Sequence, residues 1–260
     1  MGVGVKSWVR LGLLAALVAA VPAAPLAAGA KYTAQGFAFD PKARSQVVVV
    51  RPNLFMGTLD SANRQIEDPE WLAAAHVNLQ EALKRHPATK AVEWRFSDWN
   101  APSSQKLSEA FWKSVQLING DIVFKVPQGT FPVLPGEDWQ KRFKTLPKGY
   151  HPYQLPAASL DELRQVDPDA RFALLVATHD AYTTDGAKLA RLLGGMGNVV
   201  SEGVNTMAPP PHHGFTMLVD LADGKVVWFY NDGAFGGDLR KATSADKRVG
   251  QMLTGWPGGR

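Results

Sequence analysis

The chain has 260 residues, and its 28 Lys and Arg against 24 Asp and Glu give a formal net charge of +4. The basic residues are spread along the chain, so nothing marks a nucleic-acid-binding surface. There is no cysteine, which excludes disulfides, thiolate metal sites and a lipid anchor on cysteine. Hydrophobic residues make up 45% of the chain, including 8 Trp and 12 Phe, which is enough for a sizeable core.

Residues 1–30 have the pattern of a secretory signal peptide. Lys6 and Arg10 give a positive start, residues 11–21 are an unbroken apolar run, and small residues follow. The apolar run is about half of the roughly 20 residues that a membrane-spanning helix needs. We therefore expect cleavage after Ala30 and a soluble, single-domain protein of residues 31–260, in the periplasm or secreted beyond it.

Strands and helices alternate in the first half of this region. The β-branched run 46–51 predicts a buried strand, residues 53–67 read as a polar loop, and residues 91–96 predict a second strand. Asp68 and Pro69 are suited to the cap and the first position of a helix that ends before Pro87. Apolar spacing predicts another helix from Ser103 or Ser104 to about Gly120.

The second half begins with residues 127–158, which are rich in Pro, Gly and aromatic residues and predict a long loop. Two capping boxes, at 159–162 and 243–246, predict helix starts. Between them lie a buried strand at 171–178, a helix from about residue 184 to 193, and a hairpin around Asp223 and Gly224. This order predicts an α/β fold, a mixed-sheet sandwich with a C-terminal β-hairpin and a final helix.

The C-terminal third resembles a family of proteobacterial envelope proteins. The resemblance rests on Ala173-Leu-Leu-Val, His179-Asp180-x-Tyr182, Leu218-Val-Asp-Leu-x-x-Gly-Lys-Val-Val-Trp-Phe229 and Gly237-Asp-Leu-Arg240. It implies a fold similar to the α/β domain of the curli-secretion lipoprotein and the TolB N-terminal domain. It also implies a protein partner in the cell envelope and no agreed catalytic residues. Many such proteins are lipoproteins, whereas this chain has no lipobox cysteine.

His179 and Asp180 follow the strongest buried strand, where α/β sheets commonly bind ligands. With Tyr182, Thr184 and Asp185 they could line a polar pocket in which His179 is a base or a ligand. The alternative, which we favour, is a strand-end turn whose side chains bind the backbone.

His212 and His213 follow three prolines, 209–211. Together with His179 and Asp180 they suggest a metal site of two histidines and a carboxylate. No histidine pair has the helical spacing of a strong metal motif, so we prefer an exposed loop pair and expect neither a metal nor another cofactor.

The segment from Gly233 to Arg240 is rich in glycine and precedes the last predicted helix. Its amides could bind an anion with help from Arg240. The alternative is a tight turn in which Asp238 and Arg240 form an ion pair that fixes the loop.

Three hypotheses about function remain open. The first is a non-enzymatic envelope protein that assists assembly or transport through protein contacts, with Trp94, Trp99 and Trp112 as a docking patch. The second is a periplasmic hydrolase or metal-dependent enzyme that uses His179, Asp180 and either His212 or His213. The third is a small-ligand-binding module at the turn 179–186. The enzyme hypothesis requires its three groups to converge.

Overall fold

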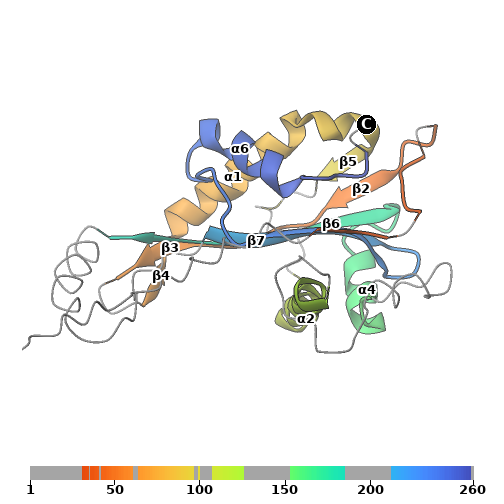
Figure 1. Ribbon diagram of the computed structural model, residues 1–260, viewed down its shortest axis with the longest axis horizontal. Coiled ribbons are helices and arrows are strands. Elements are labelled where there is room, and N and C mark those ends of the chain that lie inside the picture. Colours follow the sequence, from red (N-terminus) through yellow and green to blue (C-terminus); the bar gives the residue numbers. More distant parts are fainter. Residues whose placement is uncertain are drawn as a thin grey trace, which may run out of the picture.

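The computed structural model describes residues 31–34, 36–40, 42–60, 64–96, 99, 107–125, 153–184 and 212–258. In these residues, eight strands form one mixed sheet with helices on both faces, which confirms the α/β fold (Figure 1). The predicted signal peptide, most of the predicted loop at 127–158, and Asp185 lie outside the described residues. None of the described helices has the length and apolarity needed to cross a lipid bilayer.

The sheet is built around its longest strand, β6. The strands are β1 (Lys31–Thr33), β2 (Gln46–Val49), β3 (Asn53–Leu59), β4 (Gln65–Glu67), β5 (Glu93–Phe96), β6 (Phe172–Thr183), β7 (His212–Asp220) and β8 (Val226–Asp232). On one side β6 pairs antiparallel with β7, which continues to β8 and β1. On the other side it pairs in parallel with β2 at its start and with β3 over its second half. β5 and β4 extend β2 and β3 outward.

The strand β6 is longer than its sequence predicts. The apolar run 172–176 is buried, as expected for a strand covered on both faces. The strand then continues in register with β3 and β7 as far as Thr183. The predicted turn at 179–186 is therefore wrong over residues 179–183, because their backbone pairs with β3, and at 179 and 180 also with β7.

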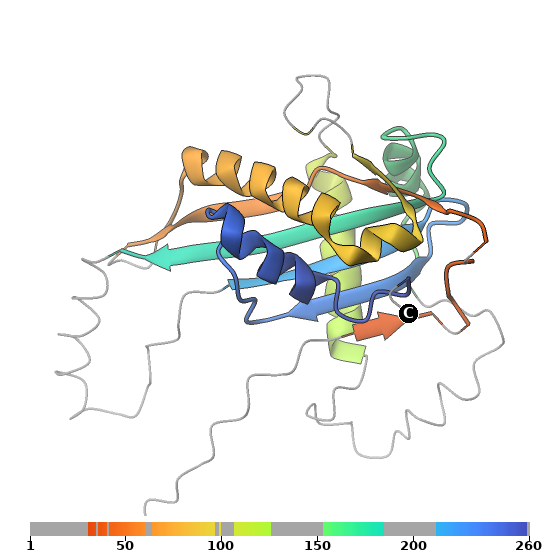
Figure 2. The ribbon, with the colours of Figure 1, turned by 90° about the horizontal axis from the view of Figure 1, so that it is seen from above.

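Among the described residues, two helices cover each face of the sheet. They are α1 (Pro69–Arg85), α2 (Glu109–Lys125), α4 (Ala157–Arg164) and α6 (Ala242–Met252), with a short 3-10 helix at Pro87–Ala91. Figures 1 and 2 show α1 and α6 side by side on one face, with α2 and α4 on the other. The side chain of Asp68 accepts hydrogen bonds from the backbone of Glu70 and Trp71, so the predicted start of α1 is confirmed.

Both predicted capping boxes are wrong. Helix α4 begins at Ala157, and the carboxylate of Glu162 accepts hydrogen bonds from Ser108 rather than capping its own helix. Helix α6 begins at Ala242, and the carboxylate of Asp246 accepts a hydrogen bond from Arg85 of α1. In each case the capping side chain is used for a contact between distant segments.

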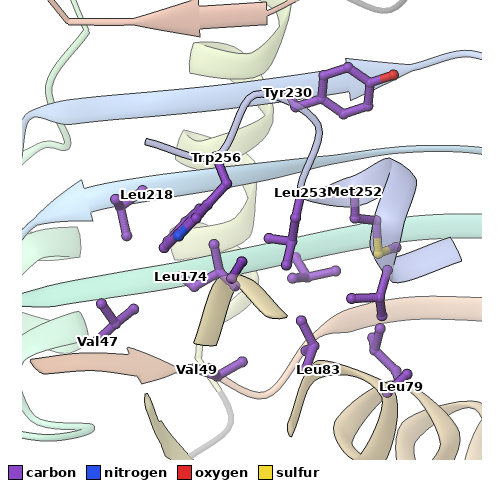
Figure 3. Close-up of a cluster of buried hydrophobic side chains, with 14 of the residues drawn as sticks. Val47, Val49, Leu79, Leu83, Leu174, Leu218, Tyr230, Met252, Leu253 and Trp256 are labelled. Atoms are coloured by element: carbon purple, nitrogen blue, oxygen red, sulfur yellow. The ribbon is translucent and has the colours of Figure 1, made fainter. Parts of the chain in front are cut away.

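The core lies in two layers, one on each face of the sheet. Figure 3 shows the layer beneath α1 and α6, where Leu79, Leu83 and Met252 meet Leu174 and Leu218. Trp99 is also buried in this layer, and Trp94 stacks on Trp256 with a centroid distance of 5.3 Å. The predicted docking patch of tryptophans is therefore wrong for these residues, since they pack within the protein.

The predicted hairpin is present as β7 and β8, with Gly224 at a φ of 75°. Its register differs from a two-residue loop because the pairing shifts between Leu218 and Val219. As a result, Trp228 packs toward α1 and α6, and Val219 packs on the opposite face.

Candidate functional site

Neighbouring residues of β6 point to opposite faces of the sheet, which separates His179 from Asp180. Asp180 is paired in register with His212, and His179 with His213. Asp180 and His212 are joined on the face covered by α6, whereas His179 and His213 stack on the other face. The predicted convergence of His179, Asp180 and one further histidine is therefore wrong, since the strand divides them into two pairs.

The Asp180 carboxylate is fully buried against Arg248 of α6. Arg248 Nη1 and Nη2 donate to the two carboxylate oxygens at 3.0 and 2.9 Å. The other donors of the guanidinium reach Thr178 Oγ1 at 2.9 Å and the carbonyls of Gly236 and Gly237 at 2.8 Å. All five N–H groups of the arginine are thereby paired, which a buried guanidinium requires.

His212 binds the exposed side of this ion pair. Its Nδ1 donates to Asp180 Oδ1 at 2.9 Å, and its side chain is 29% exposed. A neutral imidazole with a proton on Nδ1 carries its lone pair on Nε2. No described residue hydrogen-bonds that Nε2, so it remains able to accept a proton or a hydrogen bond from outside.

The network extends along β6 to Tyr182. The ring of Tyr182 lies 4.9 Å from that of His212, and its hydroxyl donates to Asp238 at 3.0 Å. Arg240 forms two hydrogen bonds of 2.9 Å with the Asp238 carboxylate, so the ion pair that the sequence suggests is confirmed. The Arg240 guanidinium lies 3.5 Å from the Tyr182 ring centroid and 4.3 Å from that of Trp71.

Tyr182 and Asp238 each have a shifted pKa that favours one protonation state. Burial, followed by the nearby carboxylates of Asp180 and Asp238, raises the pKa of Tyr182. Burial opposes ionisation of Asp238, but the hydrogen bonds from Arg240 and Tyr182 outweigh it and lower the pKa of Asp238. At neutral pH Tyr182 is therefore a phenol donor and Asp238 a paired carboxylate.

On the opposite face, His179 lies between two aromatic rings. It stacks on Phe55 at 4.3 Å and on His213 at 5.1 Å. Its Nε2 is buried without a hydrogen-bond partner among the described residues. Within the same part of the chain, no group of three His, Asp or Glu side chains could hold a metal ion, so the histidines found here do not assemble the suggested metal site.

The glycine-rich segment does not present its amides to an anion. The carbonyls of Gly236 and Gly237 face Arg248, and the amides of Gly236 and Asp238 donate to Gln251 and Ser244. Gly237 has a φ of 81°, and a Cβ there would lie 2.7 Å from the Ser244 carbonyl. The amides of Gly236 and Asp238 are therefore not available to an anion, and this tight turn instead accepts hydrogen bonds from the Arg248 guanidinium.

The structure adds three residues that the sequence analysis missed. Thr178 is a buried hydroxyl on β6, Trp71 lies in the first turn of α1, and Arg248 lies on the inner face of α6. Arg248 carries a sequence signal, since it falls three residues after Ala245 and four before Met252 on the apolar stripe of that helix. Thr184 directly follows β6, and its amide donates to the Leu59 carbonyl.

No family model and no curated protein matches the chain. Among solved structures, the PelC dodecamer from Paraburkholderia phytofirmans is similar at 14% identity, with a TM-score of 0.34, over 89% of this chain and 97% of that one. A second structure, of a point variant of that dodecamer, is similar at 12% identity with the same TM-score, over 89% and 96%. Similarity at this level carries no conclusion about activity or assembly.

Proposed function

We propose that the chain is an exported protein of the cell envelope that works without catalysis, through contact with a protein partner. The pattern of residues 1–30 supports export, because it combines a basic start, a short apolar run and small residues. The resemblance of the C-terminal third to envelope proteins supports the location. The contact surface is the cluster of Trp71, Tyr182 and Arg240.

The position of the Arg240 guanidinium over the rings of both Trp71 and Tyr182 is the observation that carries this proposal. Trp, Tyr and Arg are the residue types that dominate binding energy at protein interfaces. Here all three are half-buried, and Arg240 is 24% exposed. Because Asp238 holds the guanidinium in place, a partner would bind a surface that loses little side-chain entropy.

The two carboxylates next to the contact surface are not available as general bases. A general base needs an available lone pair and a pKa near the working pH. Both carboxylates, Asp180 and Asp238, are committed to arginines through two hydrogen bonds each. These groups stabilise one another and the fold.

A photo-cross-linking experiment in cells tests the proposal. The full chain carries a photoreactive amino acid in place of Trp71, and a matched control carries it in place of the exposed Lys113 on α2, across the sheet. We expect a discrete cross-link to an envelope protein from position 71, lost on Arg240→Glu, and none from position 113. Cell fractionation and N-terminal sequencing of the same samples should find the chain outside the cytoplasm, beginning at Lys31. An absent cross-link, or a cytoplasmic chain that keeps residues 1–30, contradicts the proposal.

A second candidate is a hydrolase, favoured by the 2.9 Å contact of Asp180 with His212. A carboxylate that accepts a hydrogen bond from Nδ1 leaves Nε2 free to take a proton from water or a hydroxyl. A screen with chromogenic esters and phosphate esters would show turnover that His212→Asn abolishes and His213→Asn retains. Turnover that is equal in both variants, or absent from the wild type, contradicts this candidate.

A further inference from the structure

The three rings of Phe55, His179 and His213 form a ladder across three adjacent strands. Phe55 is opposite His179 in the parallel pairing of β3 with β6, and His179 is opposite His213 in the antiparallel pairing of β6 with β7. The ring planes are nearly parallel, at 9° and 12°, with centroids 4.3 and 5.1 Å apart. The spacing matches that of neighbouring strands, so the ladder joins all three strands through their side chains.

The ladder tolerates little positive charge. Two imidazoles in contact repel each other when both are protonated, and burial penalises even the first charge. His179 is the inner ring, and its buried Nε2 has no described partner to share an added proton. Burial and the neighbouring His213 lower the pKa of His179, and burial lowers that of the more exposed His213 by more than the Asp180 carboxylate raises it. The paired strands are therefore more stable when both imidazole rings are neutral.

The charged and titratable groups around the ladder do not cancel this penalty. On β6, Asp180 favours protonation, but it points to the other face and is paired with Arg248 of α6. On β7, His212 opposes protonation of both rings. β3 contributes no titratable residue, and Asp232 on β8 is hydrogen-bonded to Tyr230. Among the described residues, no unpaired carboxylate stabilises an imidazolium at this position.

We propose that the Phe55–His179–His213 ladder is an acid-sensitive latch that holds the carboxyl end of β6 on β3 and β7 at neutral pH and releases it on acidification. The folded latch binds fewer protons than the opened one. Its stabilisation is therefore present above the pKa of a free histidine, about 6.5, and is lost as the pH falls through the lowered values. The opening equilibrium should increase up to about tenfold per pH unit for each proton taken up in that window.

Hydrogen exchange of the full chain at pH 7.5 and pH 5, corrected for the intrinsic exchange rate, measures the latch locally. We expect amides of residues 177–183 and 213–216 to lose protection at pH 5, while those of α4 keep theirs as an internal control. His179→Phe and His213→Phe each keep an aromatic ring in the ladder but remove the imidazole that takes up a proton. Each variant should therefore lose less protection at pH 5 than the wild type. Phe55→Leu keeps both titratable histidines. It should weaken protection at both pH values and retain the additional loss at pH 5.

The outcomes separate an acid latch from ordinary packing. If both phenylalanine variants lose protection on acidification as strongly as the wild type, the ladder does not carry the effect and the proposal is overturned. Equal loss of protection in α4 would also overturn it, because general acid unfolding would then explain the change. If one phenylalanine variant does not fold, the other and Phe55→Leu still decide between the two.

Discussion

Arg248 on α6 donates a hydrogen bond of 2.9 Å to Asp180 on β6, and neither side chain has any exposed surface. The two residues are 68 positions apart in the chain. Because Arg248 also binds the carbonyls of Gly236 and Gly237, one guanidinium joins the central strand, the last helix and the loop before it. The last helix is thus positioned by a buried ion pair as well as by its apolar stripe.

Replacing Arg248 with methionine should destabilise the protein strongly. The variant leaves the buried Asp180 carboxylate without its arginine, with the hydrogen bond from His212 remaining. Removing one partner of a buried ion pair costs about 3–5 kcal/mol in the free energy of unfolding. Urea unfolding followed by circular dichroism measures the change. Arg248→Lys keeps the charge but cannot supply the paired donors, and we expect an intermediate loss.

The double variant Arg248→Met with Asp180→Leu is the matched control. Removing both partners leaves no buried charge, so the double variant should be more stable than Arg248→Met alone. If the losses in free energy of unfolding of Arg248→Met and Asp180→Leu simply add in the double variant, the two side chains do not interact in the way described.

Asp238→Asn should make the free energy of unfolding less dependent on pH in the acidic range. The lowered pKa of Asp238 means that its stabilisation is present above about 3.9, the pKa of a free aspartate, and is lost as the pH falls below it. Since the side chain is partly exposed, we expect a loss of about 1 kcal/mol at pH 7 that shrinks at pH 2.5. Urea unfolding of wild type and variant at both pH values checks this, and a difference that stays constant argues against the assignment.

Local patterns were sufficient for the elements whose stability is local. The cap at Asp68, the buried run of β6, the Asp223–Gly224 turn and the last helix were all predicted, because each depends on residues close together in the chain. The strand β3 was missed, since Asn53 and Gly57 make it look like a loop. It is a strand because its partner is β6, more than a hundred residues away, which no local pattern records.

The candidate site was half predicted for the same reason. The pair of Asp238 and Arg240 is two residues apart and was anticipated. The alternation of β6 that separates His179 from Asp180 was not applied, because the strand was expected to end before them. Arg248 contacts Asp180 of β6, and Trp71 contacts Arg240 in the loop before α6. Each residue lies on a helix distant in sequence from its partner, so only the fold brings them together.

Two buried tryptophans should respond differently to replacement by phenylalanine. Trp99 Nε1 donates to the Val49 carbonyl at 3.2 Å, whereas the buried Trp256 Nε1 has no hydrogen-bond partner in the described part of the chain. Trp99→Phe breaks a buried hydrogen bond and should cost about 1–3 kcal/mol beyond the packing loss. Trp256→Phe removes an unsatisfied donor, so its cost should be limited to packing. Urea midpoints of the two variants compare them directly, and a larger loss at Trp256 would contradict the prediction.

A methyl group at Gly57 should detach β4 from β3. A Cβ at this position would lie 2.2 Å from the Ile66 carbonyl oxygen, and a backbone atom cannot move aside without breaking the pairing of the two strands. We expect Gly57→Ala to cost about 1–3 kcal/mol. Gly120→Ala is the matched control, because it lies within α2 with nothing within 4 Å of the new Cβ, and should stabilise that helix by up to about 1 kcal/mol. Thermal unfolding and hydrogen exchange of residues 64–67 compare the two variants. Loss of protection in β4 in Gly57→Ala, but not in Gly120→Ala, would identify the clash as the cause.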